Sequence, residues 1–153
     1  MKSLMLRMGN KKLALGFSLL VVLALAACQA APSPGDAVIN VATDPTLGKI
    51  LVGANGMTLY MFTKDAPDKS NCTGDCLAKW PPLLTKGKPV LGGGVDSSMV
   101  GSAVMADGSM IVTYNHMPLY YWVNDKAAGD VTGQNVGSVW FVVSPDGKPV
   151  GKP

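Results

Sequence analysis

The sequence predicts an all-β protein in which two tandem antiparallel β-meander repeats form one small sandwich-like or single-sheet domain. The chain repeats itself at an interval of 60 residues, and each copy has the pattern of a β-hairpin. Its 18 glycines and 11 prolines are typical of a turn-rich domain. No segment shows a helical period with caps, and only residues 75–79 are expected to form a single helical turn.

The internal repeat aligns residues 48–80 with residues 108–140 without a gap. Eight pairs of residues are identical: Gly48/Gly108, Val52/Val112, Asn55/Asn115, Met57/Met117, Leu59/Leu119, Tyr60/Tyr120, Asp65/Asp125 and Trp80/Trp140. Chance does not readily place one Tyr, one Asp and one Trp in a common register. Gene duplication is therefore the simpler explanation.

Each copy contains two β-prone runs around a turn. Asn55-Gly56 in the first copy favours a tight hairpin turn, because both residues tolerate positive φ. Asn115-His116 occupies the same place in the second copy, where His is a poorer turn residue than Gly and suggests a different type of turn. Two further turns are expected, at residues 107–108 and 145–147.

The first 27 residues read as a signal peptide. The chain begins with a basic stretch without acids, and residues 13–27 form an apolar run that is too short for a transmembrane helix. This run ends in Leu25-Ala26-Ala27-Cys28, which resembles the lipobox of bacterial lipoproteins. The resemblance implies that the thiol of Cys28 is acylated and anchors the mature chain in a lipid bilayer. An ordinary secretory signal followed by an accidental cysteine is the alternative.

We therefore divide the chain into a signal peptide (1–27), a lipidated Cys28 with a flexible tether (28–36) and a β-repeat domain (37–153). The Pro-rich tether reaches about 25 Å, which keeps the domain in the cell envelope, close to its membrane. Gln29 resembles the outer-membrane sorting signal of enteric bacteria. A Gram-positive host would instead place the protein on the outer face of its cytoplasmic membrane, and the sequence leaves the host open.

The charge of the mature chain excludes nucleic acid as a partner. The whole chain has 13 Lys and Arg against 10 Asp and Glu, but four of the basic residues belong to the signal peptide. The remainder from Cys28 onward has nine lysines against ten aspartates, a net charge near −1, and contains no Arg or Glu. No polybasic patch remains for a polyanion.

The two copies share a Y-x-[FWY]-x-x-D motif. Its residues are Tyr60, Phe62 and Asp65 in the first copy and Tyr120, Trp122 and Asp125 in the second. With the lipobox, this motif resembles the predicted bacterial lipoproteins that are also called the secreted repeat family of unknown function. The resemblance implies little about activity beyond a loose association with alkane utilisation.

Two interpretations of the motif compete. In the first, the aromatic residues form a paired core, each Tyr hydroxyl finds a hydrogen-bond partner, and the aspartates cap the turns that follow them. In the second, the aromatic residues form a binding platform and the aspartates are ligands. We expect the first, because alternating aromatic residues are what the core of a sheet requires.

Cys72 and Cys76 are expected to form a disulfide, since two cysteines remain once Cys28 is acylated and the compartment is oxidising. A thiolate copper site is the alternative. Copper is also conceivable at His116 and Met117 with Met57 as a third donor, because imidazole and thioether are soft ligands that favour Cu(I). We expect instead an exposed turn histidine and methionines that fill the core.

No catalytic residues can be assigned, since the sequence lacks a nucleophile motif and contains one His and no mature Glu or Arg. We expect a non-enzymatic envelope lipoprotein without a cofactor that binds an envelope protein, a polymer or an apolar small molecule. A periplasmic copper-binding protein is the alternative, and an envelope hydrolase is a more distant one.

Overall fold

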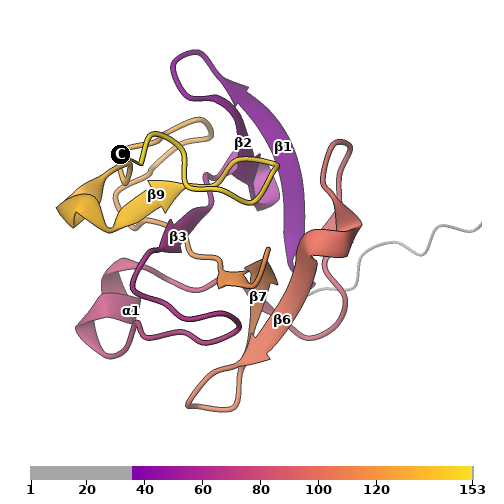
Figure 1. The fold of residues 1–153 in the computed structure, drawn as a ribbon, viewed down its shortest axis with the longest axis vertical. Coiled ribbons are helices and arrows are strands. Elements are labelled where there is room, and N and C mark those ends of the chain that lie inside the picture. The colour runs from indigo at the N-terminus through magenta and orange to yellow at the C-terminus, as the bar shows by residue number, and fades with distance from the viewer. Residues whose placement is uncertain (1–35, 153) are drawn as a thin grey trace, which may run out of the picture. The chain divides into compact units, whose positions relative to one another are not determined.

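The structure is a computed structural model that describes residues 36–152 of the chain (Figure 1). These residues form short strands with one short α-helix and three 3-10 turns. The elements in chain order are β1 (Val38–Asp44), β2 (Gly48–Val52), η1 (Ala54–Gly56), β3 (Tyr60–Phe62), α1 (Asp75–Lys79), β4 (Leu84–Thr85), β5 (Val90–Leu91), η2 (Ser97–Met99), β6 (Val100–Val104), β7 (Met110–Tyr114), β8 (Met117–Pro118), η3 (Val136–Ser138) and β9 (Trp140–Val142). The all-β class is confirmed, and α1 is the helical turn expected at this place.

The strands of the described residues form three small sheets, with orders β2-β1-β5, β3-β9 and β4-β7-β6, and β8 pairs with β7. The hairpins β1–β2 and β6–β7 are equivalent elements of the two copies. The pairing of β1 with β5 is parallel, an arrangement that the hairpin pattern did not predict. The two tandem repeats are thus built from small, mostly antiparallel sheets.

The two residues at the tip of the turn before the motif have positive φ in both copies. Asn55 and Gly56 have φ values of 57° and 75°, and Asn115 and His116 have φ values of 48° and 65°. Asn and His both tolerate the left-handed region. The turns nevertheless differ, as expected: in the first copy Ala54–Gly56 form η1 and Gly53 N donates to Met57 O, whereas in the second copy Tyr114 of β7 pairs directly with Met117 of β8. The predicted turns at 107–108 and 145–147 are present, with Gly108 and Gly147 at positive φ.

The two copies exchange backbone segments. Residues 59–63 of the first copy pair with residues 139–143 of the second, so that β3 lies beside β9 (Figure 1). The converse pairing joins residues 79–83 to residues 119–123, with hydrogen bonds from Leu83 N to Leu119 O (2.8 Å) and from Val123 N to Lys79 O (3.2 Å). These reciprocal contacts are those of an approximate twofold axis. Each copy thus completes the pairing of the other.

The core consists of two clusters that follow the alternation of side chains along the motif strands. Tyr60 and Tyr120 belong to one cluster, whereas Met61 lies in the other, with Tyr121 packed against it. Pleating therefore assigns both motif tyrosines to the same cluster. Within residues 36–152, no helix is long and apolar enough to cross a membrane.

Candidate functional site

The motif tyrosines lie next to one another at the approximate twofold axis. The amide of Tyr60 donates to the carbonyl of Tyr120, and the amide of Tyr120 donates to the carbonyl of Tyr60, both at 2.9 Å. Both side chains are completely buried. The most similar parts of the two copies therefore meet at the centre of the domain.

Each tyrosine hydroxyl donates to the aspartate of the other copy. Tyr60 Oη lies 2.6 Å from Asp125 Oδ2, and Tyr120 Oη lies 2.7 Å from Asp65 Oδ2. The motif is thus completed between the copies and not within either of them. Its residues form the predicted hydrogen-bonded core, but the partners come from the copy that the sequence pattern did not indicate.

Each aspartate also holds the loop that follows its own motif. Asp65 Oδ1 accepts from the amide of Asn71 at 2.6 Å. Asp125 Oδ1 accepts from both the amide (3.0 Å) and the hydroxyl (2.6 Å) of Thr132. The acceptor and donor are six or seven residues apart, so neither of these contacts is the Asx turn that the sequence suggested. One carboxylate therefore joins a tyrosine of one copy to a loop of the other.

Burial controls the protonation of these groups. Desolvation raises the pKa of Tyr60 and of Tyr120 far above the ordinary tyrosine value, and the adjacent carboxylates raise it further. Burial also raises the pKa of Asp65, against the opposing effect of its hydrogen bonds from Asn71 and Tyr120. Both hydroxyls therefore stay neutral and act as donors throughout the physiological pH range.

Four aromatic rings stack in one row across the axis. The order is Phe62, Trp140, Trp80 and Trp122, and the centroid distances between neighbours are 4.4, 3.9 and 4.1 Å. The two central tryptophans are equivalent residues of the repeat and are nearly parallel, with 4° between the ring planes. Tyr60 packs edge-on against Trp80, and Tyr120 does so against Trp140. The aromatic residues of both motifs are thereby used in packing between the copies.

The structure contains a disulfide between Cys72 and Cys76, the pair expected from the sequence. It joins α1 to the loop that Asp65 holds, and Cys72 is buried in the aromatic cluster. A hollow of about 370 Å³ lies beside the bridge, lined by Cys72, Thr73, Leu77 and Met105 among others. Its lining is mostly apolar, with Lys69 and Asp107 as its charged members.

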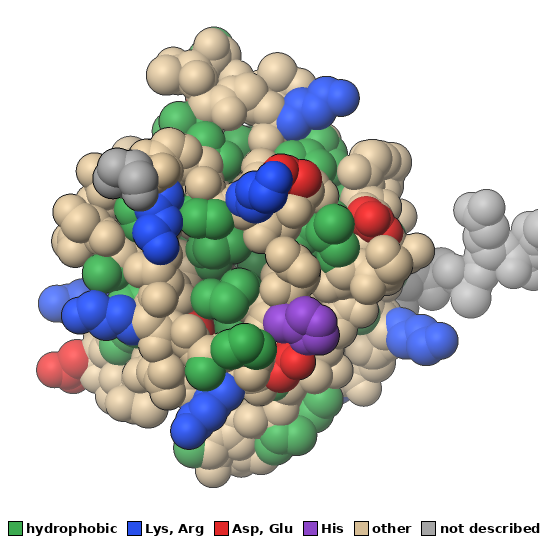
Figure 2. Space-filling model, in the orientation of Figure 1, with side chains coloured by type: hydrophobic (Ala, Val, Ile, Leu, Met, Phe, Trp, Pro, Cys, Tyr) green, Lys and Arg blue, Asp and Glu red, His purple; other side chains and the backbone are tan. Residues whose placement is uncertain are grey.

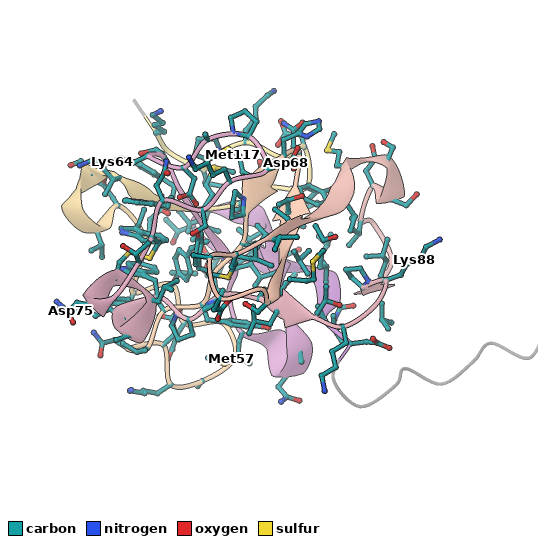
Figure 3. All side chains as sticks on the ribbon, turned by 90° about the horizontal axis from the view of Figure 1, so that it is seen from below. Met57, Lys64, Asp68, Asp75, Lys88 and Met117 are labelled. Carbon is teal, nitrogen blue, oxygen red and sulfur yellow. A yellow bond between two sulfur atoms is a disulfide. The ribbon has the colours of Figure 1, made fainter. Side chains whose placement is uncertain are left out.

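The predicted third donor of a copper site lies far from the other two. Met57 and Met117 are on opposite sides of the domain (Figure 3), because the copies are related by a rotation and their hairpin tips do not lie side by side. The three-donor site His116, Met117 and Met57 is therefore wrong as a constellation. Residues 36–152 contain no group of three His, Cys, Asp or Glu side chains that could hold a metal ion.

His116 is an exposed residue at the tip of its hairpin, as expected. Its side chain, purple in Figure 2, lies at the surface beside that of Asp68, and its Nδ1 is 2.7 Å from Asp68 Oδ2. The amide of Asp68 donates to the carbonyl of His116 at 2.7 Å. The equivalent tip in the first copy receives a hydrogen bond from Gly129 N to Gly56 O (3.3 Å). Each hairpin tip is thus held by a loop of the other copy.

Several partners of the motif were not identified from the sequence. Ser70 Oγ lies 2.7 Å from Tyr120 Oη, and the amide of Gly133 donates to Tyr60 Oη at 3.2 Å. The alignment of the copies did point to these loops, because Thr132 stands where the first copy has Cys72. The Thr132 side chain is hydrogen-bonded to Asp125, whereas Cys72 forms the disulfide. Cys28, with the signal peptide and nearly all of the tether, lies outside the described residues.

Comparison with known proteins identifies the repeat. A lipoprotein family model described as "Secreted repeat of unknown function" matches twice, at residues 41–84 and 101–144. No curated protein and no solved structure matches the chain. The two matches cover more than half of the chain and contain both Y-x-[FWY]-x-x-D motifs, so the protein belongs to this family of secreted repeats.

Proposed function

We propose that the protein is a lipid-anchored envelope module that binds a ligand or partner and does not catalyse a reaction. The observation that carries this proposal is the reciprocal use of the motif, in which Tyr60 donates to Asp125 and Tyr120 donates to Asp65. The groups that a catalytic interpretation would need are engaged in holding the two copies together. The motif then acts as a scaffold for surfaces elsewhere on the domain.

The anchor is supported by the sequence before the domain. A basic start, an apolar run and the Leu25-Ala26-Ala27-Cys28 segment agree with one another. Membership of a lipoprotein family described as a secreted repeat is in keeping with them. Under this proposal the mature chain begins at an acylated Cys28 and is held in the outer membrane of a Gram-negative host, or on the outer face of a Gram-positive cytoplasmic membrane.

Under this proposal, an apolar ligand binds in the hollow beside the disulfide. Pockets for small molecules are concave and mostly apolar, with a few polar groups that orient the ligand. Leu77 and Met105 supply the apolar lining, and Lys69 supplies a cation at the same site. Val104 also lines the hollow and is 70% exposed, which makes it accessible from solvent.

The ligand-binding role can be tested with an apolar fluorescent dye such as anilinonaphthalene sulfonate. We expect saturable binding to the folded protein and its loss in Val104→Asp, because a carboxylate in the hollow opposes an apolar anion. Val123→Asp is the matched control, since Val123 is also exposed, at 37%, but does not line this hollow. Equal binding by both variants would remove the hollow from the proposal.

The remainder of the proposal has two direct tests. Mass spectrometry of the native amino terminus should find an acylated Cys28, and Cys28→Ala should leave uncleaved or soluble protein. Purified protein should not hydrolyse ester, amide or glycosidic envelope substrates. An activity that survives purification and disappears in Asp65→Asn, with the fold retained, would replace the binding proposal by an enzymatic one.

A further inference from the structure

We infer that the surface formed by Leu84, Lys86 and Lys88 faces the headgroups of the membrane in which the protein is anchored. This inference rests on the proposed lipid anchor and specifies which side of the domain that anchor presents to the bilayer. We call these three residues the 84–88 surface. This surface contacts the headgroup layer of the lipid bilayer. The inference rests on where the chain enters the domain, on the exposure of these three side chains and on the charge of the two lysines.

The domain begins beside this surface. The amide of Ala37 lies 3.5 Å from Thr85 Oγ1, and Ala37 O accepts from the amide of Val90 at 2.8 Å. A Cβ built on Gly87 would lie 3.3 Å from a carboxylate oxygen of Asp36, the first described residue. The chain therefore enters the domain against the turn that carries Lys86 and Lys88.

The connection to the membrane is short. Seven residues separate Cys28 from Asp36, and fully extended they span about 25 Å. A domain of this size is about 35 Å across. The tether is consequently too short to pass around the domain and bring the opposite side to the membrane, so the side from which it departs remains nearest to the lipid.

The side chains of the 84–88 surface fit the headgroup region. Leu84 is 46% exposed, Thr85 is buried and Lys86 is exposed, so Leu84 and Lys86 point away from the core on the same side of β4. Leu84 and Lys86 also line a hollow of about 610 Å³ with Met110. An exposed apolar side chain flanked by lysines is the combination that interfacial segments use, with the apolar group toward the acyl chains and the ammonium groups among the phosphates.

The charge distribution favours this side over others. The mature chain has a net charge near −1, so the domain as a whole has no attraction for an anionic bilayer. Lys86 and Lys88, offset in part by the Asp36 carboxylate beside Gly87, make the point where the tether joins more positive than the chain as a whole. Lys64 lies on the opposite side of the domain from Lys88 (Figure 3), and Lys49 lies in β2 opposite Thr43, near the far end of β1 from Asp36. These positions supply matched lysines that the inference places away from the membrane.

The test uses the full acylated protein in vesicles of phosphatidylcholine with added phosphatidylglycerol. Single cysteines replace Lys86, Lys49 or Lys64 and are labelled with bimane, which is then quenched by lipids that carry a headgroup nitroxide. The disulfide and the acylated Cys28 leave the introduced cysteine as the reactive thiol. Near-ultraviolet circular dichroism of the stacked tryptophans confirms the fold of each variant.

We expect quenching at position 86 to exceed quenching at positions 49 and 64. A second arm places the label at Leu84→Cys and adds Lys86→Glu with Lys88→Glu. Loss of each lysine should lower the membrane-facing population roughly fivefold in anionic vesicles, whereas Lys49→Glu should leave the quenching at position 84 unchanged.

The outcomes separate the inference from the proposed function. Protein that fails to float with the vesicles removes the lipid anchor and, with it, this inference. Protein that floats but is quenched equally at positions 86 and 49 keeps the anchor and overturns the inference alone. Strongest quenching at position 64 would likewise overturn it, because it would place the side opposite Lys88 at the membrane.

Discussion

The hydroxyl of Tyr60 donates a 2.6 Å hydrogen bond to Asp125, a residue that lies 65 positions later in the chain and belongs to the other copy of the repeat. The equivalent bond from Tyr120 to Asp65 measures 2.7 Å. The two bonds are equivalent by sequence, but their surroundings differ. Tyr120 Oη also contacts Ser70 Oγ at 2.7 Å, whereas the second neighbour of Tyr60 Oη is an amide donor, Gly133 N.

This difference predicts unequal costs for two equivalent substitutions. In Asp65→Asn, the hydroxyl of Tyr120 can turn to donate to Ser70 Oγ, and the loss of stability should stay below about 1 kcal/mol. In Asp125→Asn, the side-chain oxygen remains with Thr132 and the hydroxyl of Tyr60 loses its acceptor, so the loss should be about 1–3 kcal/mol. Urea unfolding of both variants measures the difference. Equal losses would show that Ser70 does not compensate.

The raised tyrosine pKa values predict how the domain responds to alkali. All four tyrosines of the chain have a pKa above the ordinary value of about 10, chiefly because burial disfavours the phenolate. Because the folded-state pKa values exceed those of the unfolded chain, this contribution is complete below pH 10 and is lost as the pH rises above it.

We therefore expect tyrosinate absorbance to stay low in the folded protein just above pH 10 and to rise together with loss of the circular dichroism signal. Tyr60→Phe with Tyr120→Phe should reduce the absorbance step while retaining its cooperativity. Gradual ionisation at pH 10 in a folded domain would contradict the burial of these hydroxyls.

The exchange of segments predicts that neither copy folds alone. A fragment of residues 36–93 lacks the partner for residues 59–63, and a fragment of residues 94–152 lacks the partner for residues 119–123. Division after Gly93 leaves β1, β2 and β5 together in the first fragment. We expect each fragment to be unfolded by nuclear magnetic resonance and an equimolar mixture to regain the dispersed spectrum. A first fragment that folds by itself would show that the exchanged contacts are dispensable.

The position of Met57 predicts weak copper binding. His116 and Met117 lack the third donor that the repeat suggested, and two ligands make a weak site. Titration of Cu(I) under anaerobic conditions against a competing chelator should therefore show no tightly held equivalent. His116→Ala should change the free energy of unfolding by no more than about 0.5 kcal/mol, as for other exposed turn residues. One tightly bound equivalent that disappears in this variant would restore the metal-binding interpretation.

The features that sequence reasoning predicted were local. Asn55-Gly56 and Asp107-Gly108 determine turns through the φ values that these residues tolerate, and alternation assigns Tyr60 and Met61 to different core clusters. The disulfide could be predicted for the same reason, because Cys72 and Cys76 are only four positions apart and one bridge can join them.

The contacts between the copies could not be predicted in this way. A repeat of 60 residues shows that Tyr60 and Tyr120 are equivalent, but it does not show whether Asp65 or Asp125 accepts from Tyr60. It is equally silent on whether the copies are related by translation or by rotation. The copper constellation assumed neighbouring hairpins, and it failed for this reason.

The reciprocal pairing of Tyr60 with Tyr120 also has an evolutionary consequence. A single ancestral repeat could have made every one of these contacts as a symmetric homodimer, because each donor and acceptor in one copy has its counterpart in the other. Fusion into one chain supplies the second half at an effective concentration in the millimolar range. It also frees the halves from having to remain identical, so that a bridge at Cys72 and a histidine at 116 could each arise in one half only.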